Sequence, residues 1–331
     1  MLDGKVMVTG GAGYIGSHAV LALLDAGREV VVIDNLVTGF AWAVDPRATL
    51  VEMAVENPDV RGVLREHRVR AIMHFAGSII VPESVENPLK YYRNNTAASR
   101  ALIESAVAER VPHFIFSSTA ATYGTPERIP IAEGDPTAPI NPYGTSKLMT
   151  EIMLRDTAAA HSINYCALRY FNVAGADPAG RTGQSTAGAT HLIKVAVEAV
   201  TGKRDAVAVF GTDFDTADGT GVRDYIHVSD LAEAHVAALD LLIVEPERSH
   251  ILNCGYGRGF SVLEVLDAVD RVTNTPIERR IEGRRAGDPA ALVADNRAIL
   301  AALPWRPKRD DLDGIVQDAL MWERELAKRG L

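Results

Sequence analysis

The sequence predicts an α/β fold: a doubly wound parallel sheet with a second, smaller α+β domain. Three observations predict it. Short apolar runs alternate with helical stretches from residue 5, a glycine-rich turn follows the first run, and the alternation stops after about residue 172. Strands that alternate with helices imply right-handed crossovers, and hence a parallel sheet that is covered on both faces.

Five apolar runs read as buried strands, because they are short and rich in β-branched or aromatic residues. They span residues 5–10, 29–34, 71–77, 113–119 and 164–170. A sixth strand is predicted at 48–53, where the pattern is weaker. Between the first two strands, residues 17–27 predict a helix that ends at Gly27, since glycine favours helix C-termini.

The chain changes character after residue 172. Residues 172–190 are rich in glycine and small side chains, as expected of a long functional loop. A strand at 206–211 follows, and then a strand that leads into an amphipathic helix at 223–242. We therefore predict two domains. The first covers 1–172 and is rejoined by about 221–245, and the second consists of 173–220 and 246–331.

Composition excludes some classes of protein. The net charge of −9 argues against a general nucleic-acid binder or a protein of anionic membranes. The two cysteines, Cys166 and Cys254, lie in apparent strands, which predicts buried free thiols rather than a disulfide. No leader precedes the first strand and no apolar run is long enough to cross a bilayer, so we expect a cytoplasmic location. The sequence indicates no metal site.

The turn "TGGAGYIGS" (9–17) predicts a dinucleotide site. Gly10, Gly13 and Gly16 are spaced for a tight turn, for close approach of backbone to pyrophosphate and for close packing of helix on strand. Asp34 ends the next strand, where an acidic group accepts hydrogen bonds from ribose hydroxyls and repels a 2′-phosphate. This combination predicts a Rossmann-type domain that prefers NAD to NADP.

A second motif, "NPYGTSK" (141–147), places Tyr143 and Lys147 one helical turn apart. A positive charge at roughly 5 Å, with an effective dielectric constant of ~20, is worth about 3 kcal/mol, or ~2 pK units. Lys147 is therefore expected to lower the Tyr143 pKa, so that the phenol can take a proton from a hydroxyl. The predicted strand end at 113–119 adds a hydroxyl cluster, Ser117, Ser118 and Thr119.

These motifs together resemble the extended short-chain dehydrogenase/reductases, and they match in order over nearly the whole chain. The motifs are "TGGAGYIG" (9–16), "FSSTAATYG" (116–124), "NPYGTSK" and "RYFNVAGA" (169–176). Residues 74–95, 219–235 and 282–295 narrow the resemblance to the UDP-glucose 4-epimerase branch. That branch implies reversible oxidation at C4 of a UDP-hexose by bound NAD, with no net redox change, and a second domain that binds the nucleotide sugar.

The resemblance also implies residue roles. Tyr143 would transfer the proton, Lys147 would assist it and Thr119 would hydrogen-bond the reacting oxygen. The implied NAD-binding residues are Gly10, Gly13, Tyr14, Ile15, Gly16, Asp34, Asn35, Phe75, Ala76, Gly77, Asn94, Tyr143, Lys147 and Phe171. The implied substrate-binding residues are Thr119, Asn172, Leu192, Phe210, Arg223, Arg285 and Asp288. Arginines suit a pyrophosphate because their planar fork donates two hydrogen bonds.

Four positions depart from the family pattern. Ala54 and Ile79 replace polar residues that contact the cofactor in some relatives, which predicts weaker retention of NAD. His191 stands where some relatives have asparagine near the substrate phosphates. Leu292 stands where some have a larger tyrosine near the sugar, which predicts a broader sugar pocket.

Several alternatives stay open. A dehydratase of the same superfamily would carry an Asp-Glu pair where this chain has Ala120 and Ala121, which can do no acid–base chemistry. A catalytically silent NAD-binding regulator would lack part of the Thr–Tyr–Lys set. The sugar itself is open among UDP-glucose/UDP-galactose, UDP-N-acetylhexosamines, UDP-xylose/UDP-arabinose and UDP-glucuronate. Long helices at 89–107 and 146–160, with more than one apolar face, resemble a homodimer interface, although core packing would also explain them.

Overall fold

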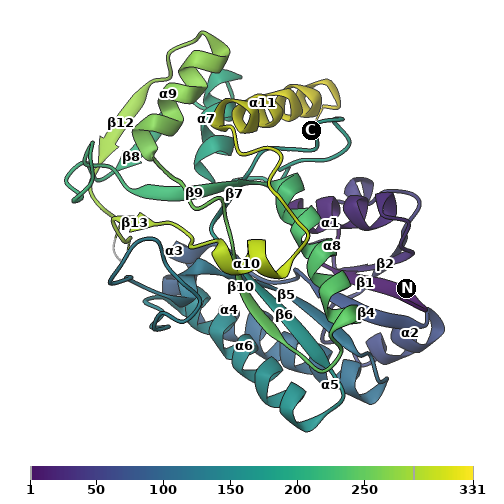
Figure 1. Ribbon diagram of the computed structural model, residues 1–331. Helices are drawn as coiled ribbons and strands as arrows, with labels where there is room; N and C mark the ends of the chain where they lie inside the picture. The colour runs from purple at the N-terminus through teal and green to yellow at the C-terminus, as the bar shows by residue number, and fades with distance from the viewer. Residues whose placement is uncertain (1, 286–287, 331) are drawn as a thin grey trace.

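The centre of the molecule is a seven-stranded parallel sheet (Figure 1), seen in a computed structural model that describes residues 2–285 and 288–330. The strand order is β10-β6-β5-β4-β1-β2-β3. The bounds are β1 (Lys5–Thr9), β2 (Val30–Asp34), β3 (Thr49–Glu52), β4 (Val69–His74), β5 (His113–Thr119), β6 (Asn164–Tyr170) and β10 (His250–Cys254). The predicted doubly wound α/β class is confirmed, and the weaker pattern at 48–53 does form a strand.

Helices cover both faces of this sheet, because successive strand residues point to opposite sides. In β1, Val6 and Val8 join one apolar core and Met7 joins the other. The first core lies under α1 (Tyr14–Asp25), α8 (Val228–Val244) and α10 (Arg297–Ala302). The second lies under α2 (Val60–Glu66), α5 (Ala98–Ala108) and α6 (Pro142–Ala160). Cys166 and Cys254 are buried free thiols, as predicted.

The helical segments differ from expectation mainly at their starts. The helix α1 begins at Tyr14, immediately after the glycine-rich turn, and so includes the last glycine of the motif. Residues 89–107 form three pieces rather than one regular helix, with a π-helical turn between two α-helical ones. These pieces, with the helix before them, are α3 (Val81–Glu86), α4 (Pro88–Tyr91), the π-turn η2 (Tyr92–Ala97) and α5.

A smaller unit lies beyond the carboxyl edge of the main sheet (Figure 1). Its four-stranded sheet consists of β7 (Asn172–Ala174), β9 (Val222–His227), β11 (Gly259–Ser261) and β13 (Ala291–Leu292). A two-stranded sheet pairs β8 (Val207–Phe210) with β12 (Arg279–Glu282). The helices α7 (Leu192–Val200), α9 (Val262–Thr273) and α11 (Leu312–Lys328) pack around a third apolar core.

The strand pairings cross the predicted domain boundaries. β10, from the range 246–331 assigned to the second domain, pairs with β6 and so extends the main sheet. β9, from the range 221–245 assigned to the first domain, pairs instead with β7, β11 and β13 in the smaller sheet. The physical reason is that α8 packs on α1 against the main sheet, so the chain enters that sheet again after α8 rather than before it.

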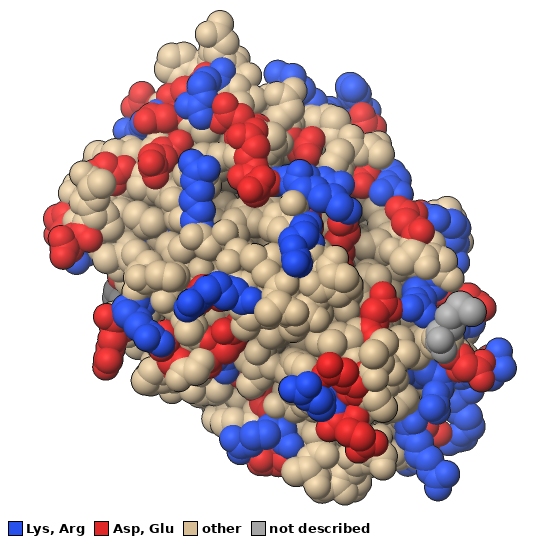
Figure 2. Space-filling view, viewed as in Figure 1, with Lys and Arg blue, Asp and Glu red and all other residues tan. Residues whose placement is uncertain are grey.

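The surface shown in Figure 2 carries both charge signs. Over the upper part of this face, Lys and Arg side chains lie among Asp and Glu side chains. Ion pairs join separate elements, for example Arg271 on α9 with Asp313 on α11. Within residues 2–285 and 288–330, no helix has the length and apolar character needed to cross a membrane.

Candidate active site

The glycine-rich turn lies where β1 and β4 end, because parallel strands present their carboxyl ends at one edge. Gly10 has a φ of +70°, and a Cβ there would lie 2.7 Å from the backbone nitrogen of Ala76. A Cβ on Gly16 would lie 2.0 Å from the Gly10 carbonyl oxygen. A Cβ on Gly13 would lie 3.3 Å from the Gly10 carbonyl oxygen, which is an easier contact than those at Gly10 and Gly16. The turn is therefore tight at two glycines and open at the third.

Asp34 fixes the turn from the neighbouring strand. Its Oδ2 accepts a hydrogen bond from the Ala12 amide at 2.9 Å, and its Oδ1 accepts one from the Leu36 amide at 2.9 Å. Each carboxylate oxygen keeps a further lone pair for a ribose hydroxyl. Asn35, also predicted at the cofactor, is exposed beside it. The structure thus brings Asp34 to the glycine turn as predicted and adds a structural role.

A loop that the sequence analysis did not single out also lies on this turn. The Phe40 amide donates to the Ala12 carbonyl at 3.0 Å, and a Cβ on Gly39 would lie 2.9 Å from the Ala12 Cβ. Thr38 lines a small cavity with Gly13 and Ser17. The available signal was the turn-forming Thr38-Gly39, four residues after a strand that ends in the acidic Asp34.

Thr119 and Tyr143 meet at the end of β5. Asn141 caps α6 by accepting the Gly144 amide at 2.9 Å, and Pro142 occupies the first turn, so the helix begins just before Tyr143. Tyr143 and Thr119 are both more than nine-tenths buried and share a side-chain hydrogen bond. The predicted pairing of a strand-end hydroxyl with the phenol is therefore present.

Lys147 lies one turn further along α6 and is also buried. Its Nζ donates to the Ser117 carbonyl at 2.9 Å and lies 5.0 Å from the centre of the Phe116 ring. Burial lowers the pKa of Lys147 to about 8. Because the ammonium faces the carbonyl edge of β5, it lies between the strand end and the segment that carries Gly77, whose Cβ position is 3.9 Å from the Nζ.

The electrostatics of Tyr143 differ from the sequence argument, which expected Lys147 to lower its pKa. Burial raises the pKa of Tyr143, and only the hydrogen bond with Thr119 acts in the opposite direction. The reason is that the Lys147 ammonium is directed to the Ser117 carbonyl and the Phe116 ring. Desolvation therefore dominates at the phenol in the protein alone.

The three hydroxyls at 117–119 point in different directions, and only Thr119 faces Tyr143. Ser117 Oγ lies 2.5 Å from the Tyr170 hydroxyl. Ser118 donates to the Glu151 carboxylate, which also forms a buried ion pair with Arg169 at 2.5 Å. Sequence reasoning missed this pair, although Glu151 lies four residues after Lys147 on the same buried face of α6.

Two adjacent asparagines in the π-helical turn hold the segment after β4. Asn95 accepts the Ser78 amide at 2.7 Å and donates to Ser146 Oγ at 3.0 Å. Asn94, the predicted site residue, donates to Ser78 Oγ at 3.1 Å. Asn95 is thus a positioning residue that the sequence analysis missed. Ile79, next in the chain, is 51% exposed.

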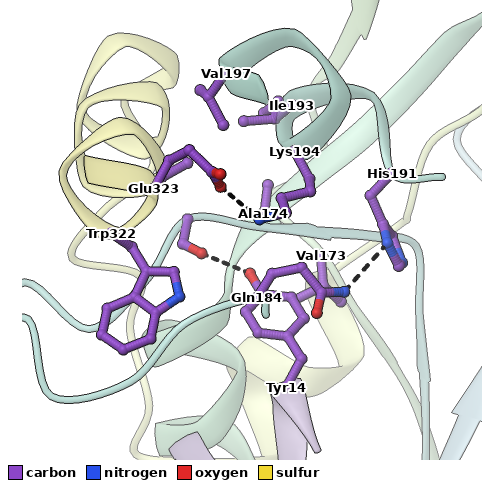
Figure 3. Close-up of a pocket in the computed structure, with 12 residues that line it drawn as sticks. Tyr14, Val173, Ala174, Gln184, His191, Ile193, Lys194, Val197, Trp322 and Glu323 are labelled. Atoms are coloured by element: carbon purple, nitrogen blue, oxygen red, sulfur yellow. Dashed lines mark hydrogen bonds and ion pairs between the residues drawn. The ribbon is translucent and has the colours of Figure 1, made fainter. Parts of the chain in front are cut away.

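Other predicted cofactor residues contribute differently. The Phe75 ring packs 4.8 Å from His235, and Ile15 packs against the apolar core. The Tyr14 hydroxyl donates to the Gly175 carbonyl at 2.7 Å and crosses to the smaller unit. Tyr14 and Trp322 both line a cavity of about 20 Å³, whose lining residues are drawn in Figure 3. These side chains are therefore committed to contacts within the protein. Ala54, in contrast, follows β3 and is half-buried.

The predicted substrate residues fall in two groups. The first group comprises charged and aromatic residues. The Arg285 guanidinium lies 3.6 Å from the centre of the Phe210 ring. Burial lowers the pKa of Arg223, and the nearby Asp288 carboxylate partly offsets that effect. In the second group, Asn172 starts β7 and Leu192 starts α7, directly after His191.

Leu292 links the two units at the site. Its strand β13 pairs with β9, where Leu292 lies opposite Arg223. Leu292 and Phe171 both pack against an apolar cluster that contains Ala120, which directly follows Thr119. The Ile131 amide donates to the Val293 carbonyl at 2.8 Å and fixes this contact. The structure therefore brings Leu292, Phe171 and Thr119 to one place.

Comparisons of this chain with a family model, with a similar protein and with two solved structures support the same interpretation. A family model for the NAD dependent epimerase/dehydratase family matches residues 6–255. A UDP-glucose 4-epimerase of Azospirillum brasilense is 56% identical over 97% of this chain and 92% of its own length. A UDP-glucose 4-epimerase structure from Stenotrophomonas maltophila, with bound NAD and formylated UDP-arabinopyranose, has a TM-score of 0.95 at 38% identity, covering 98% and 99% of the two chains. The UDP-Glc/GlcNAc 4-epimerase of Campylobacter jejuni gives 0.85 at 45% identity, covering 97% and 99%.

Proposed function

The chain belongs to the NAD-dependent epimerase/dehydratase family, and from this premise we propose that it interconverts UDP-glucose and UDP-galactose by reversible oxidation at the sugar C4. The observation that carries the proposal is the buried Tyr143–Thr119 hydrogen bond at the end of β5, beside a glycine-rich turn. A strand-end hydroxyl paired with a phenol suits the removal of a proton from a sugar hydroxyl.

The residues around the turn fit NAD. Side chains at Gly10 or Gly16 would clash with the protein backbone, so these two glycines keep the turn tight, while the space beside Gly13 would let a pyrophosphate approach the backbone. Gly13 caps α1 without a side chain, which leaves the amides of the first helical turn for phosphate oxygens. Bound NAD would supply the hydride acceptor for the sugar C4, and a cationic ring near Tyr143 would favour the ionised form of that phenol.

Each residue of the trio then has a separate task. Tyr143 takes the proton of the 4-hydroxyl and later gives it back. Thr119 donates to the reacting oxygen and holds it next to the phenol. Lys147, anchored to the Ser117 carbonyl and close to Gly77, would assist by holding the cofactor beside Tyr143. Phe210, Arg223, Arg285 and Asp288 would hold the nucleotide while the 4-keto sugar turns over, which exposes its opposite face to the cofactor.

The direct test is a product assay. Purified protein given UDP-glucose, with no added reductant, should form UDP-galactose until the two sugars reach equilibrium, and the reverse reaction should end at the same ratio. Binding of NAD without turnover of any UDP-sugar would instead support a silent NAD-binding regulator. Release of a dehydrated sugar would support a dehydratase, which Ala120 and Ala121 disfavour because alanine carries no acid or base.

A second candidate activity is epimerisation of larger UDP-sugars, above all UDP-N-acetylhexosamines. The contact of Leu292 with the cluster at Ala120, next to Thr119, supports it. Some relatives carry a larger tyrosine at this position near the sugar, so leucine would leave more room there. UDP-xylose/UDP-arabinose and UDP-glucuronate would use the same proton transfer. They remain alternatives that a panel of UDP-sugars distinguishes.

Leu292→Tyr should make the enzyme more selective for the smaller sugar. A ring at this position fills space that an N-acetyl group would occupy, and pocket contacts of this size change specificity by roughly 10- to 200-fold. We expect the ratio of kcat/KM for UDP-N-acetylglucosamine to that for UDP-glucose to fall by about 10-fold or more. Leu292→Val is the matched control and should leave the ratio nearly unchanged. If Leu292→Tyr leaves the ratio of the two kcat/KM values unchanged, the side chain at position 292 does not set the sugar preference.

We also propose that the chain forms a homodimer through the outer faces of α4 and α6. Leu89 is 77% exposed, and Met149 and Ile152 are each 40% exposed. Met149 lies against η2, since its sulfur accepts from Thr96 Oγ1 at 3.8 Å. These side chains therefore offer one apolar surface made from neighbouring helices, which suits a helix-bundle contact.

Ile152→Lys should convert the dimer into monomers, because a charge would be buried at the centre of this contact. Light scattering coupled to size-exclusion chromatography measures the mass directly. Val244→Lys is the control, since Val244 is 77% exposed at the end of α8 and outside the proposed face. A wild-type monomer, or a dimer that survives Ile152→Lys, would contradict this interface.

The cytoplasmic location stays a prediction, for which cell fractionation is the test.

A further inference from the structure

Four side chains form a contact between the loop after β2 and the end of α11. We name this set the aromatic clasp: Phe40, Trp42, Trp322 and Arg329. The Phe40 and Trp42 rings are stacked with centroids 5.2 Å apart, and Trp42 lies 6.2 Å from Trp322. The Arg329 guanidinium lies 5.0 Å from the Trp322 ring and 6.0 Å from the Trp42 ring. The clasp thus joins residues almost three hundred positions apart.

On one side, the clasp is attached to the cofactor turn. The Phe40 ring belongs to the clasp, and the Phe40 backbone amide donates to the Ala12 carbonyl at 3.0 Å. Gly39 packs on Ala12, and the Ala12 amide in turn donates to Asp34. Any movement of Trp42 away from α11 would therefore pull on the loop that borders the glycine-rich turn.

On the other side, the clasp is attached to α11 and the loop of the smaller unit. Trp322 is buried, and its Nε1 donates to Ser185 Oγ at 3.2 Å. A Cβ on Gly183 would lie 2.4 Å from the Trp322 ring, so that loop is packed directly onto the indole. Figure 3 shows Trp322 and Glu323 on α11, with Glu323 directed to Lys194, and both line the pocket that Tyr14, the first residue of α1, also lines. Trp322, on α11, is thus held by contacts with Ser185 and Gly183.

The exposed members of the clasp have no large share in the apolar core. Trp42 is 39% exposed and the Arg329 side chain is 37% exposed. Neither belongs to the three large cores of the two units. Their contacts hold a surface loop rather than the fold, and stacked aromatic and cation–π contacts add to stability in such places.

We propose that the aromatic clasp sets how long the protein retains NAD, by holding the loop of residues 36–44 against the glycine-rich turn. This inference rests on the proposed function only in that NAD is the ligand of the turn. Trp42 and Arg329 are positioning residues, since they act through Phe40 and Ala12 and touch no reacting atom. The clasp would also compensate for Ala54 and Ile79, which offer no polar contact to the cofactor.

The experiment compares two variants that change the clasp with one control variant outside it. Trp42→Ala removes the central ring, Arg329→Gln removes the cation, and Arg324→Gln makes the same change on the exposed face of α11 as a control. Each protein is loaded with NAD and diluted, and the bound nucleotide is quantified over time. We expect NAD release to be about 10-fold faster in Trp42→Ala and about 3-fold faster in Arg329→Gln, with Arg324→Gln like wild type.

A second readout separates positioning from general damage. Saturating NAD should restore wild-type kcat in both clasp variants, and the melting temperature of the NAD-free proteins should stay close to that of the wild type. Two of the three tryptophans lie in the clasp. Adding NAD to nucleotide-free wild-type protein should therefore change the indole emission, and the change should shrink in Trp42→Ala.

If both Trp42→Ala and Arg329→Gln release NAD at the wild-type rate, the proposed role of the clasp is wrong. If Trp42→Ala does not fold, Arg329→Gln decides alone, because its ring contacts are intact. A wild-type protein that binds no NAD would refute the proposed function instead. A protein that binds NAD with clasp-independent release would refute only this inference.

Discussion

Tyr143→Phe is expected to lower kcat by about 10²- to 10⁴-fold, the usual contribution of a general acid–base group. The ring stays, so the T-shaped contact with Tyr91, at a centroid distance of 6.4 Å, is preserved. The substitution removes only the hydroxyl that is hydrogen-bonded to Thr119. The melting temperature and the amount of bound NAD should therefore stay near the wild-type values.

Substitutions at Thr119 provide the matched control for that result. Thr119→Ser keeps the hydroxyl and should be mild, whereas Thr119→Val keeps the shape and should be severe. Steady-state rates of UDP-galactose formation measure all three variants. Near-wild-type turnover of Tyr143→Phe, or equal effects of Thr119→Ser and Thr119→Val, would mean that this buried pair is structural rather than catalytic.

Glu151→Ala should destabilise the protein by about 3–5 kcal/mol, because it leaves the Arg169 guanidinium buried without its partner. Both side chains are at most 4% exposed, and Glu151 also accepts a hydrogen bond from Ser118. Denaturant unfolding measures the loss. Because Ser118 precedes Thr119, the variant should also have lower activity at temperatures where it remains folded.

Two controls isolate this effect. Glu104→Ala removes an exposed ion pair with Arg100, with side chains 59% and 63% exposed, and should cost less than about 1 kcal/mol. Replacing both Glu151 and Arg169 with methionine removes the two charges together and should recover much of the stability lost in Glu151→Ala. If Glu151→Ala and Glu104→Ala were equally stable, the buried pair would not hold β5, β6 and α6 together as the structure indicates.

Local patterns predicted the parts of the fold that depend on near neighbours. The strand alternation located the strands β1 to β6, and the spacing of Gly10, Gly13 and Gly16 predicted a turn that the backbone contacts now explain. The Tyr143–Lys147 spacing predicted a shared helix face, because that geometry follows from helical periodicity alone. Each of these signals lies within one supersecondary unit.

Tertiary contacts decided what the sequence did not predict. The sequence indicates a strand at Cys254, but only the pairing of β10 with β6 assigns that strand to the main sheet. The Tyr143 pKa depends on burial, which spacing along a helix does not report. Likewise, the Glu151–Arg169 pair and the contact of Trp42 with Trp322 join residues that are distant in the chain. Spacing along the sequence does not indicate such pairs, so only the folded structure identifies them.

The fate of the hydrogen at sugar C4 tests the central claim most directly. UDP-glucose that carries deuterium at C4 is incubated with the protein and unlabelled NAD, and the UDP-galactose formed is analysed by mass spectrometry. Because the hydrogen removed from C4 is the one returned, the account predicts that the product keeps the deuterium at C4 and that no free NADH accumulates with turnover. Loss of the deuterium to solvent, or release of NADH in step with product, would contradict it.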